Sequence, residues 1–351
     1  MNPVTAILIG AGARGQIYAR YAQEHPEELR IIAVAEPKAD RRALMCRAYG
    51  IPADRAFSNW EDLMARPQMA DAALICTLDD MHTEPTLAAL KQGYHVLLEK
   101  PMSNSETECR AIAAAAEEAQ RVLSVCHVLR YTPFYRTIKQ LIDDGQVGEV
   151  ASLSQVENVG YWHHAHSFVR GNWRCSEQTS PMILQKSCHD MDILLWLSGQ
   201  RCTRVSSFGS LHHFDAAHAP QDAPLRCTDG CPHSVVCPYD AGKIYLTDNV
   251  GWPTDMLTTD LSREGRLKAL REGPYGRCVY HCDNDVVDRQ VVNLEFDNGA
   301  VAGFTMTAFT TDMARQLKVC GTKGQITADM NANTVSLHRF GESGPREITL
   351  E

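Results

Sequence analysis

One stretch of sequence, Thr5–Gly15, decides the expected fold, and it reads TAILIGAGARG. A short apolar run leads directly into the pattern G-x-G-x-x-G and then into a helical pattern, which is the context that gives the pattern meaning. Gly10 allows a tight turn, Gly12 lets the backbone approach a pyrophosphate, and Gly15 lets helix and strand pack closely. The helix N-terminus then faces the anion. We therefore expect a dinucleotide-binding loop made of Gly10, Gly12, Ala13, Arg14 and Gly15.

The expected partner for the cofactor's ribose is Glu36, which follows the expected strand Arg30–Ala35. It comes about 20 residues after the last glycine, where a carboxylate can accept hydrogen bonds from both ribose hydroxyls. A 2′-phosphate would meet a like charge there, so we expect NAD rather than NADP. Arg41 and Arg42 leave a second interpretation open, since they could reach a 2′-phosphate or be solvated helix charges. For the pattern as a whole, the alternative is a glycine turn with a surface glutamate.

The remainder of residues 1–128 alternates short β-branched runs with helical patterns. This alternation is typical of a parallel sheet with crossover helices, so we expect an α/β, doubly wound Rossmann domain over residues 1–128. The expected strands are Thr5–Ile9, Arg30–Ala35, Asp71–Cys76, His95–Leu98 and Val122–Val128. The expected helices are Gly15–Glu24, Ala39–Tyr49, Trp60–Ala65, Thr83–Gln92 and Ser105–Gln120.

Residues 129–351 follow a different pattern, which predicts an α+β domain built on an open, mostly antiparallel sheet. Helices are expected over Pro133–Asp144 and Pro181–Leu197, the second with Ser180 as its N-cap. Asn298-Gly299 predicts a tight hairpin. Residues 212–287 have little periodicity and are rich in Cys, which marks a functional or cross-linked insertion. The expected strands are Val150–Val159, Val205–Leu211, Val291–Phe296, Val301–Phe309, Leu317–Cys320 and Val335–Phe340.

Composition limits the class of protein. The 351 residues carry 34 Lys and Arg against 43 Asp and Glu, a formal charge of −9, and 44% of them are hydrophobic. This apolar fraction excludes a disordered chain, and the acidic balance argues against nucleic acid as a partner. No apolar run approaches the roughly 20 residues that span a bilayer, and the N-terminal segment lacks the charged start of a signal peptide. We expect a cytoplasmic protein with no membrane partner.

Further motifs resemble those of one family. Glu99-Lys100-Pro101 follows the expected strand His95–Leu98, and Thr77 and His82 come after the preceding strand. His189 and Asp192 form an H-x-x-D pair in the second domain. With the glycine loop and a closing G-x-x-G, these motifs resemble the Gfo/Idh/MocA oxidoreductases, the group of glucose-fructose oxidoreductase and inositol dehydrogenase, over essentially the whole chain.

The resemblance implies NAD(P) bound in the first domain, with cofactor contacts from Thr77, His82, Glu99 and Lys100. It implies a sugar or polyol held between the two domains, and a homodimer or homotetramer built on the open sheet. Oxidation of a secondary alcohol needs the alcohol proton removed as the hydride leaves, so a base must reach the hydroxyl. Lys100 and His189 are the candidate catalytic residues. The alternative for Lys100 is a solvated lysine at the end of a strand. The alternative for His189 is a buried histidine whose hydrogen bonds are all made within the protein.

Lys186 is a third candidate in the catalytic group, because it precedes His189 by three residues and would share its helix face. The family usually has an aspartate four residues before the histidine, where this chain has Gln185. Lys186 therefore brings a positive charge next to the position where the family has a carboxylate. We expect Lys186 to contact the substrate, and the alternative is a surface lysine. Asp190 or Asp192 would orient His189 instead, and for Asp192 the alternative is a bond to the backbone or to an arginine.

Two segments combine hydrogen-bonding side chains with flat aromatic rings, which suits recognition of sugars. One is residues 127–131 and the other is residues 161–174. An aromatic interface loop is the alternative for the second segment, and a catalytic metal on its histidines is not favoured. The expected substrate-binding residues are His127, Arg130, Tyr131, Trp162, His163, His166, Arg170, Trp173 and Asp190.

The charges near these segments suggest an anionic substrate. Arg130, Arg170, Arg174 and Lys186 together would favour a carboxylate, sulfonate or phosphate group. The expected partner is thus a small sugar or glycoside, with an acidic group as a hypothesis.

The chain has 13 cysteines, several of them inside the insertion. Cys227-x3-Cys231-x5-Cys237 can converge on one centre, with Cys278 or Cys282 as the fourth member. Four thiolates would hold a structural zinc or an iron–sulfur cluster. We take Cys227, Cys231, Cys237 and Cys278 as the candidate ligands. Small, partly buried side chains without a ligand are the alternative.

These observations favour an NAD-dependent oxidoreductase acting on a secondary alcohol of a sugar, glycoside or sugar acid. A second hypothesis keeps the same site but cleaves or epimerises a glycoside through transient oxidation, with no net redox change. A third, from another class, is a dinucleotide sensor without catalysis.

Overall fold

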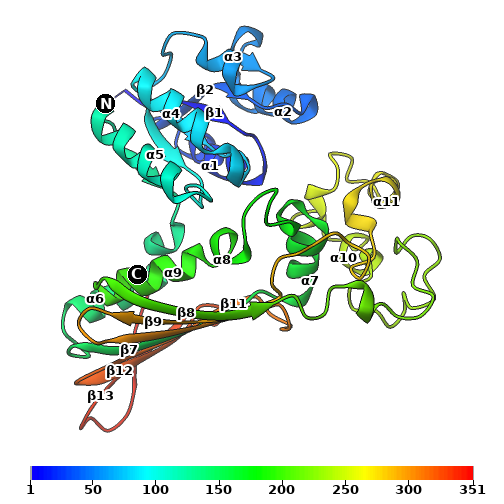
Figure 1. Cartoon of the computed structure of the whole chain (residues 1–351). Helices are drawn as coiled ribbons and strands as arrows, with labels where there is room; N and C mark the ends of the chain where they lie inside the picture. The colour runs from blue at the N-terminus through cyan, green and yellow to red at the C-terminus, as the bar shows by residue number, and fades with distance from the viewer. Residues whose placement is uncertain (1, 351) are drawn as a thin grey trace. The chain divides into compact units, whose positions relative to one another are not determined.

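The computed structural model describes residues 2–350, which form two compact units. The first unit comprises the chain up to Cys126 together with Gln178–Ser180, and the second comprises His127–Glu177 and the chain from Pro181 onward. Figure 1 shows each unit with its own sheet. Among the helices of residues 2–350, none combines the length and apolar character needed to cross a bilayer.

The first unit contains a six-stranded parallel sheet in the order β3-β2-β1-β4-β5-β6. The reversal of strand order between β1 and β4 is the point where such sheets bind ligands. This confirms the doubly wound prediction. The strands are β1 (Val4–Ile9), β2 (Leu29–Ala35), β3 (Ala56–Phe57), β4 (Ala72–Ile75), β5 (His95–Leu98) and β6 (Leu123–Val125).

Helices of the first unit pack against the sheet through apolar side chains, and the sheet's two faces belong to separate hydrophobic clusters. Gly50 and Gly93 end α2 and α4 in left-handed conformations. The Ser105 hydroxyl accepts a hydrogen bond from the Glu108 amide and caps α5. The helices are α1 (Ala13–Glu24), α2 (Ala39–Tyr49), α3 (Trp60–Met64), α4 (Thr83–Gln92) and α5 (Glu106–Ala119).

The second unit contains an eight-stranded sheet in the order β14-β13-β12-β11-β7-β10-β9-β8. Among the described strands of this sheet, β7 and β10 alone pair in parallel, so the sheet is mostly antiparallel, as predicted. The predicted turn at Asn298-Gly299 joins β9 to β10. The strands are β7 (Val150–Asn158), β8 (Cys202–Ser210), β9 (Arg289–Phe296), β10 (Val301–Thr307), β11 (Ala314–Gly321), β12 (Gly324–Asp329), β13 (Thr334–Arg339) and β14 (Arg346–Glu347).

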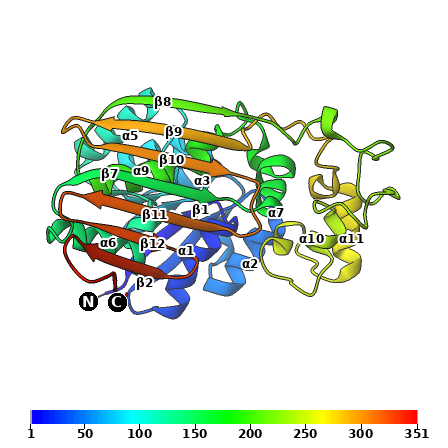
Figure 2. The same cartoon turned by 90° about the horizontal axis from the view of Figure 1, so that it is seen from below.

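Helices α6 (Pro133–Asp143) and α9 (Cys188–Ser198) cover one face of this sheet. Phe134 of α6 and Leu194 of α9 join Leu153 and Phe304 of the strands in one core. The opposite face carries exposed side chains, among them Phe208 and Val301, and it faces the viewer in Figure 2. The sheet is therefore open on one side.

The prediction of one continuous helix over Pro181–Leu197 is wrong. The structure has α8 (Met182–Gln185) and α9, with a break at Lys186 and Ser187. Ser180 is not the N-cap, because Pro181 occupies that position and the Ser180 hydroxyl donates to the Asp79 carboxylate instead. Tertiary partners thus override the local capping signal.

Two further segments differ from the expectation. Residues 161–170 do not form the loop considered as an alternative for this segment, since α7 (Tyr161–His164) continues into a π-helix at Ala165–Arg170. The strand expected over Val122–Val128 ends at Val125, and Val128–Tyr131 forms a 3-10 turn. The insertion also contains two helices, α10 (Ala241–Tyr245) and α11 (Arg263–Glu272), which Figure 1 shows together in yellow and yellow-green.

Candidate functional site

The glycine loop lies between β1 and α1 in the first unit. Gly10 has φ of +89°, and a Cβ there would lie 2.5 Å from the carbonyl oxygen of Cys76. A Cβ on Gly15 would lie 2.1 Å from the carbonyl oxygen of Gly10. Both positions therefore require glycine for reasons internal to the chain. A Cβ on Gly12 would meet nothing within 4 Å, so the space beside it is open for a ligand's phosphates.

Glu36 is buried at the end of β2, and its carboxylate is fixed against the glycine loop. One carboxylate oxygen accepts a hydrogen bond from the Ala11 amide at 2.8 Å, and the other accepts from the Lys38 amide at 2.9 Å. Arg42 donates to the backbone carbonyls of Glu36 and Pro37. The guanidinium of Arg42 is thus already bonded to the loop after β2.

Glu99, at the end of β5, joins that strand to α1. It is 4% exposed, and its carboxylate accepts hydrogen bonds from Arg14 Nε at 2.9 Å and from the Tyr18 hydroxyl. The other carboxylate oxygen accepts from the amide of Lys100 at 2.8 Å. Burial opposes the charge on Arg14, but the adjacent Glu99 carboxylate still raises the pKa of that guanidinium. This ion pair fixes the backbone from which the Lys100 side chain extends.

His82 and Thr77 lie at the same end of the sheet. His82 has no exposed surface, and its Nδ1 lies 2.7 Å from the carbonyl oxygen of Pro101. Its Nε2 lies 3.3 Å from the carbonyl oxygen of Thr77. The histidine therefore bridges the loop after β4 to the turn that carries Lys100, which makes it a positioning residue in this structure.

In the second unit, α9 and the 3-10 turn before α6 gather four polar side chains. The rings of His127 and His189 meet edge to face with centroids 6.1 Å apart. Asp192 accepts a two-pronged pair from Arg130, at 2.7 Å and 2.6 Å, and lies 3.9 Å from His127 Nδ1. Tyr131 in the same turn is 70% exposed. Asp192 therefore organises Arg130 and His127 beside His189.

A buried ion network that was not foreseen from the sequence lies under α8 and α9. Glu157 on β7 is 2% exposed and binds Lys186 Nζ at 2.8 Å and Arg315 Nε at 2.7 Å. Arg315 also binds Asp190, which is fully buried and bonded to Gln155. Burial raises the pKa of Glu157, although both cations oppose the rise. The inward alternation of Gln155 and Glu157 along β7 was the signal available in the sequence.

The π-helix segment forms an aromatic cluster with the insertion. The ring centroids of Trp162 and Trp252 are 5.2 Å apart. The His166 ring stacks on Tyr275 with centroids 4.7 Å apart, and its Nδ1 lies 2.9 Å from the Tyr245 hydroxyl. Burial lowers the pKa of His166 to about 3. Burial, with Lys186 nearby, also lowers the pKa of His163 well below its usual range.

Trp173, also predicted to bind substrate, packs at the edge of the second unit's core, with its ring centroid 6.5 Å from that of Phe168. Arg174 pairs with Asp283 at 2.8 Å, and Asp283 also binds Arg277. The side-chain hydrogen bond from Arg174 lowers the pKa of Asp283. Arg174 therefore shares one carboxylate of the insertion with Arg277.

The four cations expected to attract an anion all have partners within their own unit. Arg130 pairs with Asp192, Arg174 with Asp283 and Lys186 with Glu157. Arg170 has no exposed surface, and it donates to two backbone carbonyls and to a cysteine sulfur. The grouping predicted from sequence therefore supplies no free positive patch, and Arg170 acts in packing the insertion.

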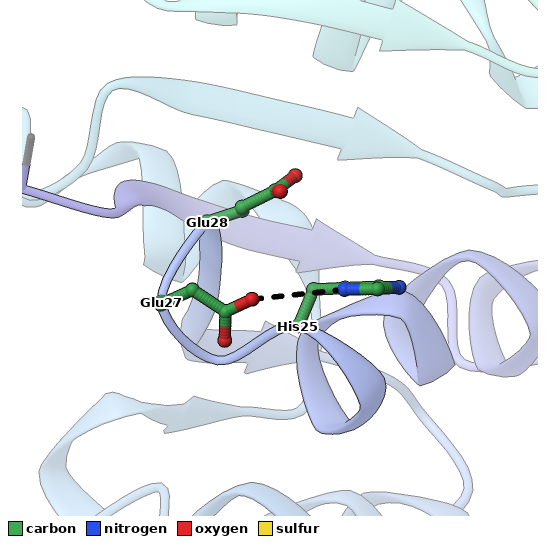
Figure 3. Close-up of side chains that lie close together, drawn as sticks. All are labelled: His25, Glu27 and Glu28. Carbon is green, nitrogen blue, oxygen red and sulfur yellow. Dashed lines mark ion pairs between the residues drawn. The ribbon is translucent and has the colours of Figure 1, made fainter.

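The four candidate metal ligands of the insertion come together around one small cavity. Cys227, Cys231, Cys237 and Cys278 all line it, together with Arg170. Cys282 instead donates to the carbonyl oxygen of Cys278 at 3.2 Å. Among residues 2–350, the one set of His, Cys, Asp and Glu whose ligand atoms all lie within 4.8 Å of one another is His25, Glu27 and Glu28. Figure 3 shows this set in the turn after α1, where exposed side chains form a surface ion pair of 3.7 Å.

A glycine-turn Rossmann unit followed by a unit with helices on one face of an open sheet defines a class of two-domain, dinucleotide-binding oxidoreductases. Residues 4–127 match the oxidoreductase family with an NAD-binding Rossmann fold, and residues 135–327 match the GFO/IDH/MocA C-terminal domain. The chain belongs to the Gfo/Idh/MocA family.

Individual relatives are more distant. The chain is 25% identical over 275 residues to the oxidoreductase YteT of Bacillus subtilis, covering 76% of this chain and 62% of the relative. It is 28% identical over 199 residues to an inositol 2-dehydrogenase of Corynebacterium glutamicum, and the match covers 56% of this chain and 55% of that protein. Its fold is similar to that of a levoglucosan dehydrogenase in complex with NADH and L-sorbose, with a TM-score of 0.71, 19% identity, and coverage of 99% and 80%. The chain thus spans less than two thirds of the length of the two curated relatives, YteT and the inositol 2-dehydrogenase.

Proposed function

We propose that this protein is an NAD-dependent dehydrogenase for a secondary alcohol of a neutral sugar, polyol or glycoside. The observation that carries the proposal is the buried carboxylate of Glu36, which is bonded to the Ala11 amide of the glycine loop. The relatives support the substrate class, because their names describe action on inositol and levoglucosan.

The residues of the first unit fit NAD. The open space beside Gly12 suits a pyrophosphate, and Glu36 suits two ribose hydroxyls. The 2′-phosphate of NADP would be repelled by the Glu36 carboxylate. Arg42 is already bonded to two backbone carbonyls, which disfavours its use as a phosphate ligand. When bound, the cofactor supplies the hydride acceptor.

Lys100 and His189 are the proposed proton carriers. The Lys100 backbone is held by Glu99, which supports a defined direction for its side chain. His189 sits on α9 beside His127 and the Arg130–Asp192 pair. Lys186 is proposed to position α8 through Glu157, with a substrate contact as a secondary role.

A neutral substrate is favoured over an anionic one. The buried network contains two positive side chains, Lys186 and Arg315, and two negative ones, Glu157 and Asp190. Arg130 and Arg174 are each paired with a carboxylate outside this network. An acidic substrate that used Lys186 would have to compete with the buried Glu157 carboxylate, and breaking a buried charge pair costs several kcal/mol. The partly exposed pairs of Arg130 and Arg174 would cost less to open.

The test is a panel of neutral polyols, sugars and glycosides beside the matching uronates, with NADH formation as the readout. Lys100→Met and His189→Asn should each lower kcat by about 100-fold or more, since general acid–base groups contribute that much. Lys91→Met, at an exposed site on α4, is the matched control and should keep full activity. Unchanged kcat in both site variants, or activity confined to uronates, would refute the proposal.

A further inference from the structure

We propose that Cys227, Cys231, Cys237 and Cys278 bind one structural zinc ion inside the insertion of the second unit. Their shared cavity has a volume of about 20 Å³, which is room for a single water-sized occupant. A lone zinc ion held by four thiolates fits that scale, whereas an iron–sulfur cluster needs more space.

The backbone brings two of the four cysteines together from distant parts of the chain. Arg226 and Arg277 form an antiparallel bridge, flanked by hydrogen bonds from the Cys227 amide to Gly276 and from the Cys278 amide to Leu225. In this register Cys227 and Cys278 are diagonal neighbours on one side of the ladder, a separation that side chains can span. The ladder thus supplies two ligands that face the same space.

The other two cysteines come from the tight loop that follows Cys227. The Ser234 amide donates to the Cys231 carbonyl, and the Cys237 amide donates to the His233 carbonyl. These turns fold the loop back, so that Cys231 and Cys237 line the same cavity as the ladder cysteines. His233 also lines the cavity, and because its Nε2 lies 2.7 Å from the Gln221 carbonyl, Nδ1 is the ring atom left for a metal.

An independent observation comes from Arg170, which has no exposed surface and lines the cavity. Its Nε and Nη2 donate to the carbonyls of Arg277 and Tyr239, and Nη2 also lies 3.5 Å from the Cys227 sulfur. Its Nη1 is buried and donates no hydrogen bond, although Tyr245 interacts with the guanidinium. Among residues 2–350 no carboxylate forms an ion pair with Arg170, and Asp240, the carboxylate that lines the same cavity, instead accepts from the amides of Gly242 and Lys243. A zinc tetrathiolate carries two negative charges and would add to the charge of Asp240 in balancing the buried guanidinium.

Zinc binding would draw the four sulfur atoms inward. No three of them yet lie all within 4.8 Å of one another, and all 13 cysteines are free of disulfides. Tetrahedral zinc with Zn–S distances of about 2.3 Å sets the sulfur atoms nearly 4 Å apart. The proposal therefore requires the cysteine side chains to move closer together when zinc binds.

The ion would fix the part of the insertion that contacts the aromatic cluster. Arg170 ends the π-helix that carries His166, and it donates to the carbonyls of Tyr239, two residues after Cys237, and of Arg277, just before Cys278. The insertion also supplies Trp252 and Tyr275 against Trp162 and His166. Loss of zinc should therefore change the environment of these tryptophans.

The experiment measures metals in the untagged, full-length protein by mass spectrometry. We expect about one zinc per chain and only background iron. Cys227→Ser and Cys278→Ser should each lower the zinc content at least about tenfold, whereas the matched control Cys46→Ser on α2 should keep it. Wild-type protein that stays zinc-free after incubation with zinc, equal zinc in all variants, or an iron–sulfur chromophore would overturn the proposal.

A second measurement needs no variant to fold. A mercurial thiol reagent added stepwise to the wild-type protein should release zinc in proportion to the thiols modified, with a parallel change in tryptophan fluorescence. Thiol modification that releases no zinc would contradict the site. Both readouts are independent of catalytic activity, so their failure leaves the proposed dehydrogenase function standing.

Discussion

Glu36 is the single side chain with the greatest influence on the choice of dinucleotide. Glu36→Gln keeps an oxygen that can accept the Ala11 hydrogen bond but removes the negative charge. We expect NADH affinity to fall about tenfold, because hydrogen bonds to a charged group contribute about 1.5–3 kcal/mol, and NADPH affinity to stay equal or rise. Titration calorimetry checks this, with Glu61→Gln on the exposed surface of α3 as the control. A parallel loss for both cofactors would speak against a contact to the 2′-hydroxyl.

His164 makes the second unit sensitive to acid. Its ring is fully buried beside Phe214, both nitrogens lack hydrogen-bond partners in the described chain, and burial lowers its pKa to about 3. An unfolded histidine has a pKa of about 6.5, so between these values the unfolded chain binds a proton that the folded chain does not. Stability is therefore fully present above pH about 6.5 and falls as the pH drops.

The expected slope from His164 is up to about 1.4 kcal/mol per pH unit between those two values. His164→Phe should remove this contribution and flatten the pH dependence of the free energy of unfolding, measured by urea denaturation. His25→Gln, in the exposed turn after α1, is the control and should leave the slope unchanged. An unaltered slope in His164→Phe would show that the ring is not kept neutral by burial.

At the scale of elements, Glu157 links β7, the α8–α9 break and β11 through two cations. Glu157→Gln should destabilise the second unit by about 3–5 kcal/mol, since it leaves Lys186 buried without its carboxylate. Glu295→Gln, which breaks an exposed pair with Arg204, should cost no more than about 1 kcal/mol. Chemical denaturation of the two variants gives the comparison, and equal losses would contradict the role of the buried network.

The elements also show what the sequence could predict. Strong local signals, such as the glycine turn after β1 and the Asn298-Gly299 hairpin, specified their structures because the backbone there depends on a few nearby residues. The break at Lys186 and Ser187 could not be predicted in this way, because α8 and α9 are separated where Lys186 bonds to Glu157, a residue on a distant strand.

The same limit applied to the candidate site. The cysteine spacing indicated a common centre, and the structure places all four side chains on one cavity. The cluster of Arg130, Arg174 and Lys186 was visible in the sequence, but their carboxylate partners come from other elements. Pairing between distant residues, rather than residue type, determines whether such cations remain available to an anion.

At the scale of the whole molecule, cofactor binding should appear as a gain in thermal stability. A ligand that binds only the folded state at about 100 times its Kd stabilises it by about 2.7 kcal/mol. NADH should therefore raise the Tm of the wild-type protein more than NADPH does at equal concentration, measured by scanning calorimetry. An equal shift with both cofactors would contradict the role assigned to Glu36.

The most direct test of the central claim is the stoichiometry of the reaction with a neutral polyol or sugar that the panel identifies. We predict one NADH formed for each molecule of ketone product, with both quantities measured in the same sample. A changed sugar with no accumulated NADH would contradict net oxidation and would indicate transient oxidation instead. NADH binding without turnover on any sugar would contradict the account as a whole.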